Sequence, residues 1–145
     1  MGIDKDIMLL IETRLKTLSW VKLVNWKRLR LGSSDFRDHE IPLIQFYDAG
    51  QRITHDAARL KVEWLISVEL VLKSTAAIEI DVEDLLDKRQ ELEQCLGAQE
   101  THTGLQGLQH LRYTGNEPDF LSIAPFFITR LDFEALFYKP YVRNC

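Results

Sequence analysis

The chain has 145 residues, of which 46% are hydrophobic and 28% are charged, and its formal net charge is −4 at pH 7. These fractions are those of an ordinary globular protein, and the length suffices for one domain with a substantial core. A negative net charge argues against a dedicated nucleic-acid-binding domain, because such domains are strongly basic. We therefore predict a single domain over residues 1–145 that needs neither disulfides nor metal ions to fold.

Cysteine content and the N-terminal residues indicate the cellular location of the protein. Only Cys95 and Cys145 are present, which is more typical of a reduced cytosolic protein than of a disulfide scaffold, with one intramolecular bridge as the alternative. Met1–Asp6 lacks the basic region that opens a signal peptide, and no apolar run approaches the ~18 residues of a membrane span. We expect a cytosolic protein without a membrane segment.

The first part of the chain is predicted to form a helix followed by short strands. Asp4–Leu18 carries apolar residues at spacings of three and four, which predicts an amphipathic helix that Asp4 caps. Trp20–Leu31 alternates only in part and favours one or two short strands. Ile41–Tyr47 is predicted to be a strand with Pro42 near its start, where a missing amide donor is tolerated.

Leu60–Lys73 is the longest run of alternating apolar and polar side chains. One face is predicted to carry Leu60, Val62, Trp64, Ile66, Val68, Leu70 and Leu72. At roughly 3.3 Å per residue the strand spans about 43 Å, whereas a compact domain of this length is about 38 Å across. The strand must therefore bend or project towards a neighbour. Asp48–Arg59 leads into it, either as a loop or as the tip of an extended β-hairpin.

The second half begins with a predicted helix, Val82–Leu96. Asp81 is expected to be its N-cap, and Gly97 is expected just after its end. Its inward apolar stripe is predicted to consist of Val82, Leu85, Leu86, Leu92 and Leu96.

Two further strands complete the prediction. Leu108–Tyr113 is a weak strand pattern, an irregular loop is expected over Thr114–Pro125, and Phe127–Tyr138 is a strong strand pattern. Together the elements predict an α+β domain: about four main strands in a mostly antiparallel sheet, with two helices packed on one face.

No catalytic or metal-binding motif stands out in the sequence. GxSxG, HExxH, P-loop and GxGxxG patterns are absent, and the histidines have no metal-ligand spacing with a cysteine. Asp35–Glu40 contains three acids and a histidine that could imitate a catalytic cluster, but a solvated loop explains them more simply. We expect a non-enzymatic protein without cofactor or metal, and keep a small enzyme as the least favoured alternative.

Basic and aromatic side chains are interleaved in one stretch, formed by Trp20, Lys22, Trp26, Lys27, Arg28 and Arg30. This composition can meet nucleic-acid phosphates and bases. A basic edge on an acidic chain equally suits association with other copies of the chain, and we favour that interpretation. The terminal segment after Tyr138 adds Tyr141, and the segment either frays or docks on an adjacent subunit.

The order of predicted elements resembles that of the tail terminator (minor tail protein U-like) family of tailed bacteriophages and related tail-completion proteins. The resemblance rests on the helix Asp4–Leu18, the proline-marked strand at Ile41–Ile44, the long strand Leu60–Lys73, the helix Val82–Leu96 and the closing strand Arg130–Tyr138. It is a likeness of pattern over most of the chain, without a diagnostic motif.

The resemblance implies a virion protein of the tail or neck, assembled in the host cytoplasm. It implies a homo-hexameric ring that caps the tail tube, ends tail polymerisation and joins the tail to the head. Implied partners are the tail-tube protein, the sheath in a tail that has one, and a neck or head-completion protein, with DNA passing through the lumen without specific binding. A neck or head-completion connector of similar fold and a small nucleic-acid-binding module are the alternatives.

Two sets of residues are expected to make these contacts. The expected subunit or partner interface consists of Trp20, Trp26, Lys27, Arg28, Arg30, Arg52, His55, Arg59, Tyr138 and Tyr141. The polar face of the long strand, with Lys61, Glu63 and Glu69, is expected to line the lumen or an interface.

Overall fold

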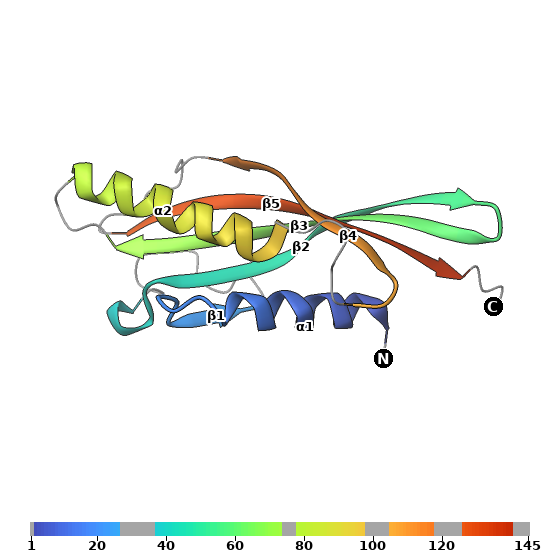
Figure 1. Ribbon diagram of the computed structural model, residues 1–145, viewed down its shortest axis with the longest axis horizontal. Helices are drawn as coiled ribbons and strands as arrows, with labels where there is room; N and C mark the ends of the chain where they lie inside the picture. The colour runs from blue at the N-terminus through green and yellow to red at the C-terminus, as the bar shows by residue number, and fades with distance from the viewer. Residues whose placement is uncertain (1, 27–36, 74–77, 98–104, 118–125, 141–145) are drawn as a thin grey trace.

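In the part of the chain that the structure describes, a five-stranded sheet packs with two helices (Figure 1). The computed structural model describes residues 2–26, 37–73, 78–97, 105–117 and 126–140. Along the chain the elements are α1 (Ile3–Leu15), β1 (Leu23–Asn25), a 3₁₀ turn η2 (Asp38–Glu40), β2 (Leu43–Asp56), β3 (Arg59–Lys73), α2 (Ile78–Gly97), β4 (Leu108–Glu117) and β5 (Phe126–Pro140).

The strands lie in the order β1-β2-β3-β5-β4. Only β1 and β2 run parallel, and the other neighbouring pairs are antiparallel. The predicted α+β class with a mostly antiparallel sheet is confirmed. The strand number is five rather than about four, because the three-residue β1 adds an edge strand within the stretch where short strands were predicted.

The long alternating strand forms as predicted, and β3 is its structural counterpart. Its six side chains from Val62 to Leu72 at every second position are buried against the helices, whereas Leu60 is only half-buried. β3 pairs over its whole length with β5, from Arg59 opposite Pro140 to Lys73 opposite Phe126. Since two strands of fifteen residues run side by side, the sheet is much longer than the helices that cover it (Figure 1).

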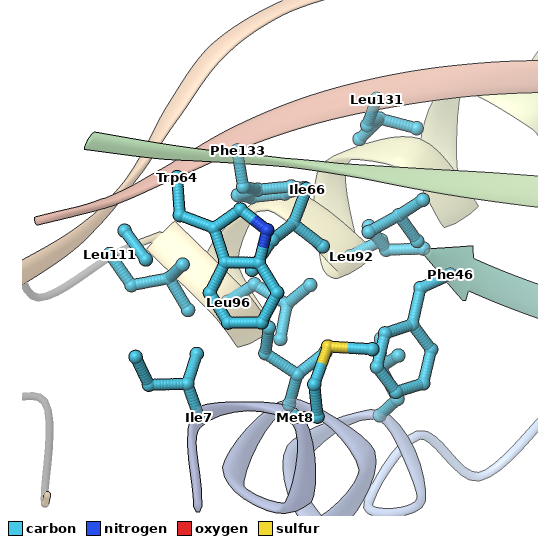
Figure 2. Close-up of a cluster of buried hydrophobic side chains, with 14 of the residues drawn as sticks. Ile7, Met8, Phe46, Trp64, Ile66, Leu92, Leu96, Leu111, Leu131 and Phe133 are labelled. Carbon is cyan, nitrogen blue, oxygen red and sulfur yellow. The ribbon is translucent and has the colours of Figure 1, made fainter. Parts of the chain in front are cut away.

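The main core lies between the helices and one face of the sheet, as Figure 2 shows. Ile7 and Met8 of α1 approach the sheet beside Trp64, and Leu92 and Leu96 of α2 come in from the other helix. The two helices also touch each other, because the thiol of Cys95 donates a hydrogen bond of 3.0 Å to the carbonyl oxygen of Arg14. Both helices therefore pack on the same face, as predicted.

The opposite face of the sheet carries a second, smaller apolar cluster at the end away from the β2–β3 turn. It consists of Ile41, Leu43, Val71, Phe126 and Ile128. Next to it Glu69 is buried, and its carboxylate accepts hydrogen bonds of 2.9 Å from Gln45 Nε2 and 3.1 Å from the Tyr47 hydroxyl. A buried carboxylate is tolerated here because neighbouring donors replace water.

The helix ends differ from their predictions. The N-cap of α1 is Gly2, which makes no side-chain cap hydrogen bond, and α1 ends at Leu15 rather than Leu18. Asp4 lies inside the first turn, where the helix dipole favours an acid. Helix α2 begins at Ile78, so Asp81 lies within the helix and is not its N-cap.

Three strands also have ends that differ from the predicted ones. Strand β2 continues to Asp56, so the segment predicted as the connection Asp48–Arg59 is mostly strand, and only two residues separate β2 from β3. Strand β4 extends to Glu117 into the predicted irregular loop. Strand β5 extends from Phe126 to Pro140, two residues beyond the predicted end.

Candidate interaction surface

The most distinctive feature of the molecule is a three-stranded projection, here called the arm. It consists of residues 51–63 of the β2–β3 hairpin and residues 136–140 of β5. In Figure 1 the hairpin and the end of β5 extend well past both helices. Side chains from Arg52 to Arg59 are exposed, whereas the same strands are buried within the body. The predicted projection of the long strand is therefore present, and it takes the form of a hairpin joined by β5.

A β-bulge marks the base of the arm. The β2–β3 register shifts between Asp48 and Gln51, and the side chain of Asp48 accepts hydrogen bonds there from the Gly50 amide (2.7 Å) and the Trp64 indole (2.8 Å). A bulge bends its strand and increases local twist. The bulge and its two hydrogen bonds thus mark the point where β2 passes from the body of the sheet into the arm.

Two polar contacts tie the arm to α1. Asp4 Oδ2 accepts a hydrogen bond of 3.2 Å from Gln51 Nε2, and Asp4 Oδ1 lies 2.9 Å from Lys139 Nζ. The contacts join both outer strands of the arm to one carboxylate, β2 at the base of the arm through Gln51 and β5 near its end through Lys139. Farther out, strand pairing is supplemented by the contacts of Arg59 with Tyr138 and Asp56.

The outer backbone edges of the arm have no described strand beside them. Among the described residues, β1 pairs with β2 only from Leu43 to Gln45, and β4 pairs with β5 only as far as Phe137. Edge strands with unpaired amides and carbonyls are sites where another chain can add. The arm therefore offers both side-chain faces and backbone edges to a partner.

The face of the arm that points away from the helices is rich in cations. The register places Arg52 beside Glu63, Lys61 beside Tyr138, and Arg59 beside Pro140. The Arg59 guanidinium carbon lies 3.8 Å from the centre of the Tyr138 ring, and Arg59 Nη2 lies 3.6 Å from Asp56 Oδ2. The other face carries Ile53, which is 53% exposed, together with His55 and Leu60.

Six of the residues predicted to make contacts lie together on the arm, namely Arg52, His55, Arg59, Lys61, Glu63 and Tyr138. The sequence placed them in a connecting loop and two separate strands. The structure brings them to one projection because β5 pairs with β3 up to the hairpin tip. Because these six residues lie on one projection, the arm is the candidate interaction surface.

The remaining predicted contact residues do not share this surface. Trp20 donates a hydrogen bond of 2.8 Å to Glu91 and lies under Lys88, whose Nζ is 5.4 Å from its ring centre. Trp26 packs on Phe46, with ring centres 6.3 Å apart. Both indoles therefore contribute to packing in the body. Lys27, Arg28, Arg30 and Tyr141 lie outside the described residues.

Glu69 was grouped with Lys61 and Glu63 on the expected lumen or interface face. The structure shows that its side chain is only 3% exposed and hydrogen-bonded within the sheet. Glu69 shares the face, as alternation requires, but it offers no exposed carboxylate. Its role is in the packing of the sheet, and on β3 the exposed part of that face runs from Leu65 into the arm.

A second surface was missed by the sequence analysis. Val82 and Leu86 of α2 were predicted to point inward, but they are 50% and 48% exposed. Helix α2 packs on the core through Leu92 and Leu96 nearer its end, with Leu85 partly buried against it. The sequence signal was present, because Val82 and Leu86 are four residues apart and adjacent on one side of the helix.

Neither metal nor membrane geometry is evident in the described ranges. No three His, Cys, Asp or Glu side chains within them come together as metal ligands. No described helix is long and apolar enough to cross a membrane.

Comparison with known proteins gives no further assignment: the chain matches no protein-family model and no curated protein.

Proposed function

We propose that this chain is a non-enzymatic structural component of a tailed-phage virion, a tail-terminator-like subunit that assembles into a ring. The ring would cap the tail tube, stop tail polymerisation and join the tail to the neck. The observation that carries the proposal is the arm: its base contributes Val62 and Phe137 to the core, whereas its outer part, from Arg52 to Arg59, projects beyond the core and is exposed.

The arm is unfavourable in free energy for an isolated chain in water. A short, flat group of strands without a core on either face is marginal in water, and its open edges invite association. Here the chain maintains two fifteen-residue strands and a hairpin whose outer part is exposed on both faces. Such a feature is explained if a partner covers it. A subunit that contacts its neighbour through a projection can form head-to-tail contacts, and these close into a ring where the rotation between copies allows closure.

The order of α1, β2, β3, α2 and β5 supports the phage assignment, because it is the order of the helix, proline-marked strand, long strand, helix and closing strand on which the resemblance described above rests. A neck or head-completion connector of similar fold would use the same arm, so it is the second candidate. The nucleic-acid alternative is weakened, because Trp20 and Trp26 are engaged in packing.

The test is the mass in solution, measured by light scattering, alone and with the tail-tube protein encoded by the same genome. A ring gives a mass several times that of the monomer, about sixfold for a hexamer. A variant with residues 54–61 replaced by an Asn-Gly turn, which leaves the paired residues Ile53 and Val62 on either side of the turn, should keep its circular dichroism spectrum and become monomeric. A full-length protein that stays monomeric at high concentration and does not bind the tail-tube protein would contradict the proposal.

A further inference from the structure

The outward side of α2 has an apolar stripe bordered by acids. Val82 and Leu86 form the stripe, and Glu83 and Asp87 follow each of them by one residue on the adjoining side. Of the α2 side chains that the structure describes, the exposed ones are Val82, Glu83, Leu86, Asp87, Gln90, Glu91 and Gln94, and none is a cation. Arg89, three residues after Leu86 on the same side of the helix, is a half-buried cation at the border of this surface. The surface, here called the α2 outer face, is mainly apolar and negative.

The arm has the opposite charge character. On its face away from the helices, Arg52, Arg59 and Lys61 outnumber the acids Asp56 and Glu63. The ring of Tyr138 lies among them under Arg59, which adds an aromatic surface to the cations. The arm therefore carries exposed cations and an aromatic ring, which the α2 outer face lacks.

The two surfaces cannot meet within one chain. In Figure 1 the arm projects from one end of the molecule, and the first turns of α2, with Val82 and Leu86, lie at the other end. Contact between them must therefore join two copies.

We infer that the arm of one copy docks on the α2 outer face of the next copy. Arg52 and Lys61 face Glu83 and Asp87 of the neighbour, and Tyr138 covers its Val82 and Leu86. This inference rests on the self-association in the proposed function and names the surfaces that make it, without requiring a tail tube.

Charge also selects against the other arrangements. Two arms placed face to face bring cations together, and two α2 outer faces bring acids together, so symmetric dimers through either surface are opposed by repulsion. The arm-to-α2 contact is attractive and uses different surfaces on each copy. Such a heterologous contact propagates to a closed ring or a filament, depending on the rotation between copies.

A charge-swap experiment tests the inference. The first variant carries Arg52→Glu and Lys61→Glu, and the second carries Glu83→Lys and Asp87→Lys. Each variant alone sets like charges against each other at every contact, so light scattering at low salt should give the monomer mass. Mixed in equal amounts, the two variants can alternate around a ring with every contact attractive, and the oligomer mass should return.

The controls separate folding from association. Both variants must keep the circular dichroism spectrum and melting temperature of the natural chain. Leu86→Ser should weaken association, whereas Leu9→Ser, at an apolar α1 residue that is 39% exposed, should leave the mass unchanged. Association of the natural chain should also weaken as salt rises to about 0.5 M, because exposed charges are screened.

The outcomes also distinguish this inference from the proposed function. A natural chain that is strictly monomeric, swapped variants that still assemble alone, or a mixture that stays monomeric would each overturn the docking contact. Restored assembly that never binds tail-tube protein would support the contact and refute the tail-terminator function.

Discussion

The indole of Trp64 donates a hydrogen bond of 2.8 Å to Oδ1 of Asp48, the residue at which β2 leaves its regular register with β3. The same oxygen accepts the amide of Gly50 at 2.7 Å. Trp64 is 4% exposed, so its N–H has little access to water. One carboxylate therefore satisfies a core indole and fixes the bulge from which the arm projects.

We expect Asp48→Ala to lower the free energy of unfolding by about 1–3 kcal/mol, because a buried donor loses its acceptor. Asp48→Asn keeps a carbonyl oxygen at the same place and should cost less than about 1 kcal/mol. Urea unfolding followed by far-ultraviolet circular dichroism measures both. Equal losses in the two variants would show that the charge of Asp48, rather than these hydrogen bonds, stabilises the bulge.

The hairpin turn contains a backbone conformation that its residue disfavours. Ala57 has a φ of 54° in the two-residue turn Ala57-Ala58, and a left-handed conformation costs a non-glycine residue about 1–2 kcal/mol. Ala57→Gly should therefore stabilise the arm and slow amide exchange there by about fivefold. Ala58→Gly is the matched control, because Ala58 does not have a positive φ. It should speed exchange, and a similar response to both substitutions would contradict the explanation.

Gly97 ends α2 for a reason other than the one predicted. Gly97 was predicted to lie just beyond the end of the helix, but it is the last helical residue and is not among the glycines with positive φ. A Cβ at this position would lie 3.2 Å from the backbone nitrogen of Tyr113 and 3.5 Å from Phe133 Cε1. The glycine is required because α2 approaches β4 closely.

Gly97→Val should consequently destabilise the protein by about 1–3 kcal/mol, because backbone must move to admit the side chain. Gly115→Val is its control in β4, since a Cβ there meets nothing within 4 Å. It should change the free energy of unfolding by no more than about 0.5 kcal/mol. Thermal unfolding of the two variants measures the difference, and equal melting temperatures would disprove the contact argument.

Strand alternation was the most informative signal in the sequence. It predicted β3 almost to the residue, and the length estimate required a bend or a projection, of which the structure shows the projection, since strand geometry converts residue number into distance directly. The hairpin was less clear because its turn is Ala57-Ala58 rather than a pair such as Asn-Gly. Gly50, the nearest glycine, lies in the bulge.

Helical periodicity was less informative, because it identifies an apolar stripe but does not predict how much of the stripe packs on the sheet. Helix α2 has twenty residues, about 30 Å of length. Its first described turns, with Val82 and Leu86, are exposed, and its later turns are buried. The α2 outer face could therefore be found only once the position of the helix over the sheet was known.

Burial raises the pKa of the Cys95 thiol above its ordinary value of 9.0, although the hydrogen bond with Thr17 and the charge of Arg14 oppose the shift. The folded protein therefore holds less reactive thiolate at pH 8 than the unfolded chain. In a Cys145→Ser background, alkylation by iodoacetamide at about pH 8 should be slower in the folded protein than in urea. Equal rates would contradict the protection of this thiol.

The same shift sets the sign of a pH dependence. Because the pKa is higher in the folded state, the stabilisation is complete below the unfolded pKa and declines as the pH rises from there through the folded pKa. Denaturation in urea between about pH 7 and about pH 10 should show the decline in the natural chain and a smaller one in Cys95→Ala. The difference is expected to be small, since the thiol is half-buried and keeps its hydrogen bond to Arg14. A natural chain that gains stability relative to Cys95→Ala over this range would reverse the predicted sign.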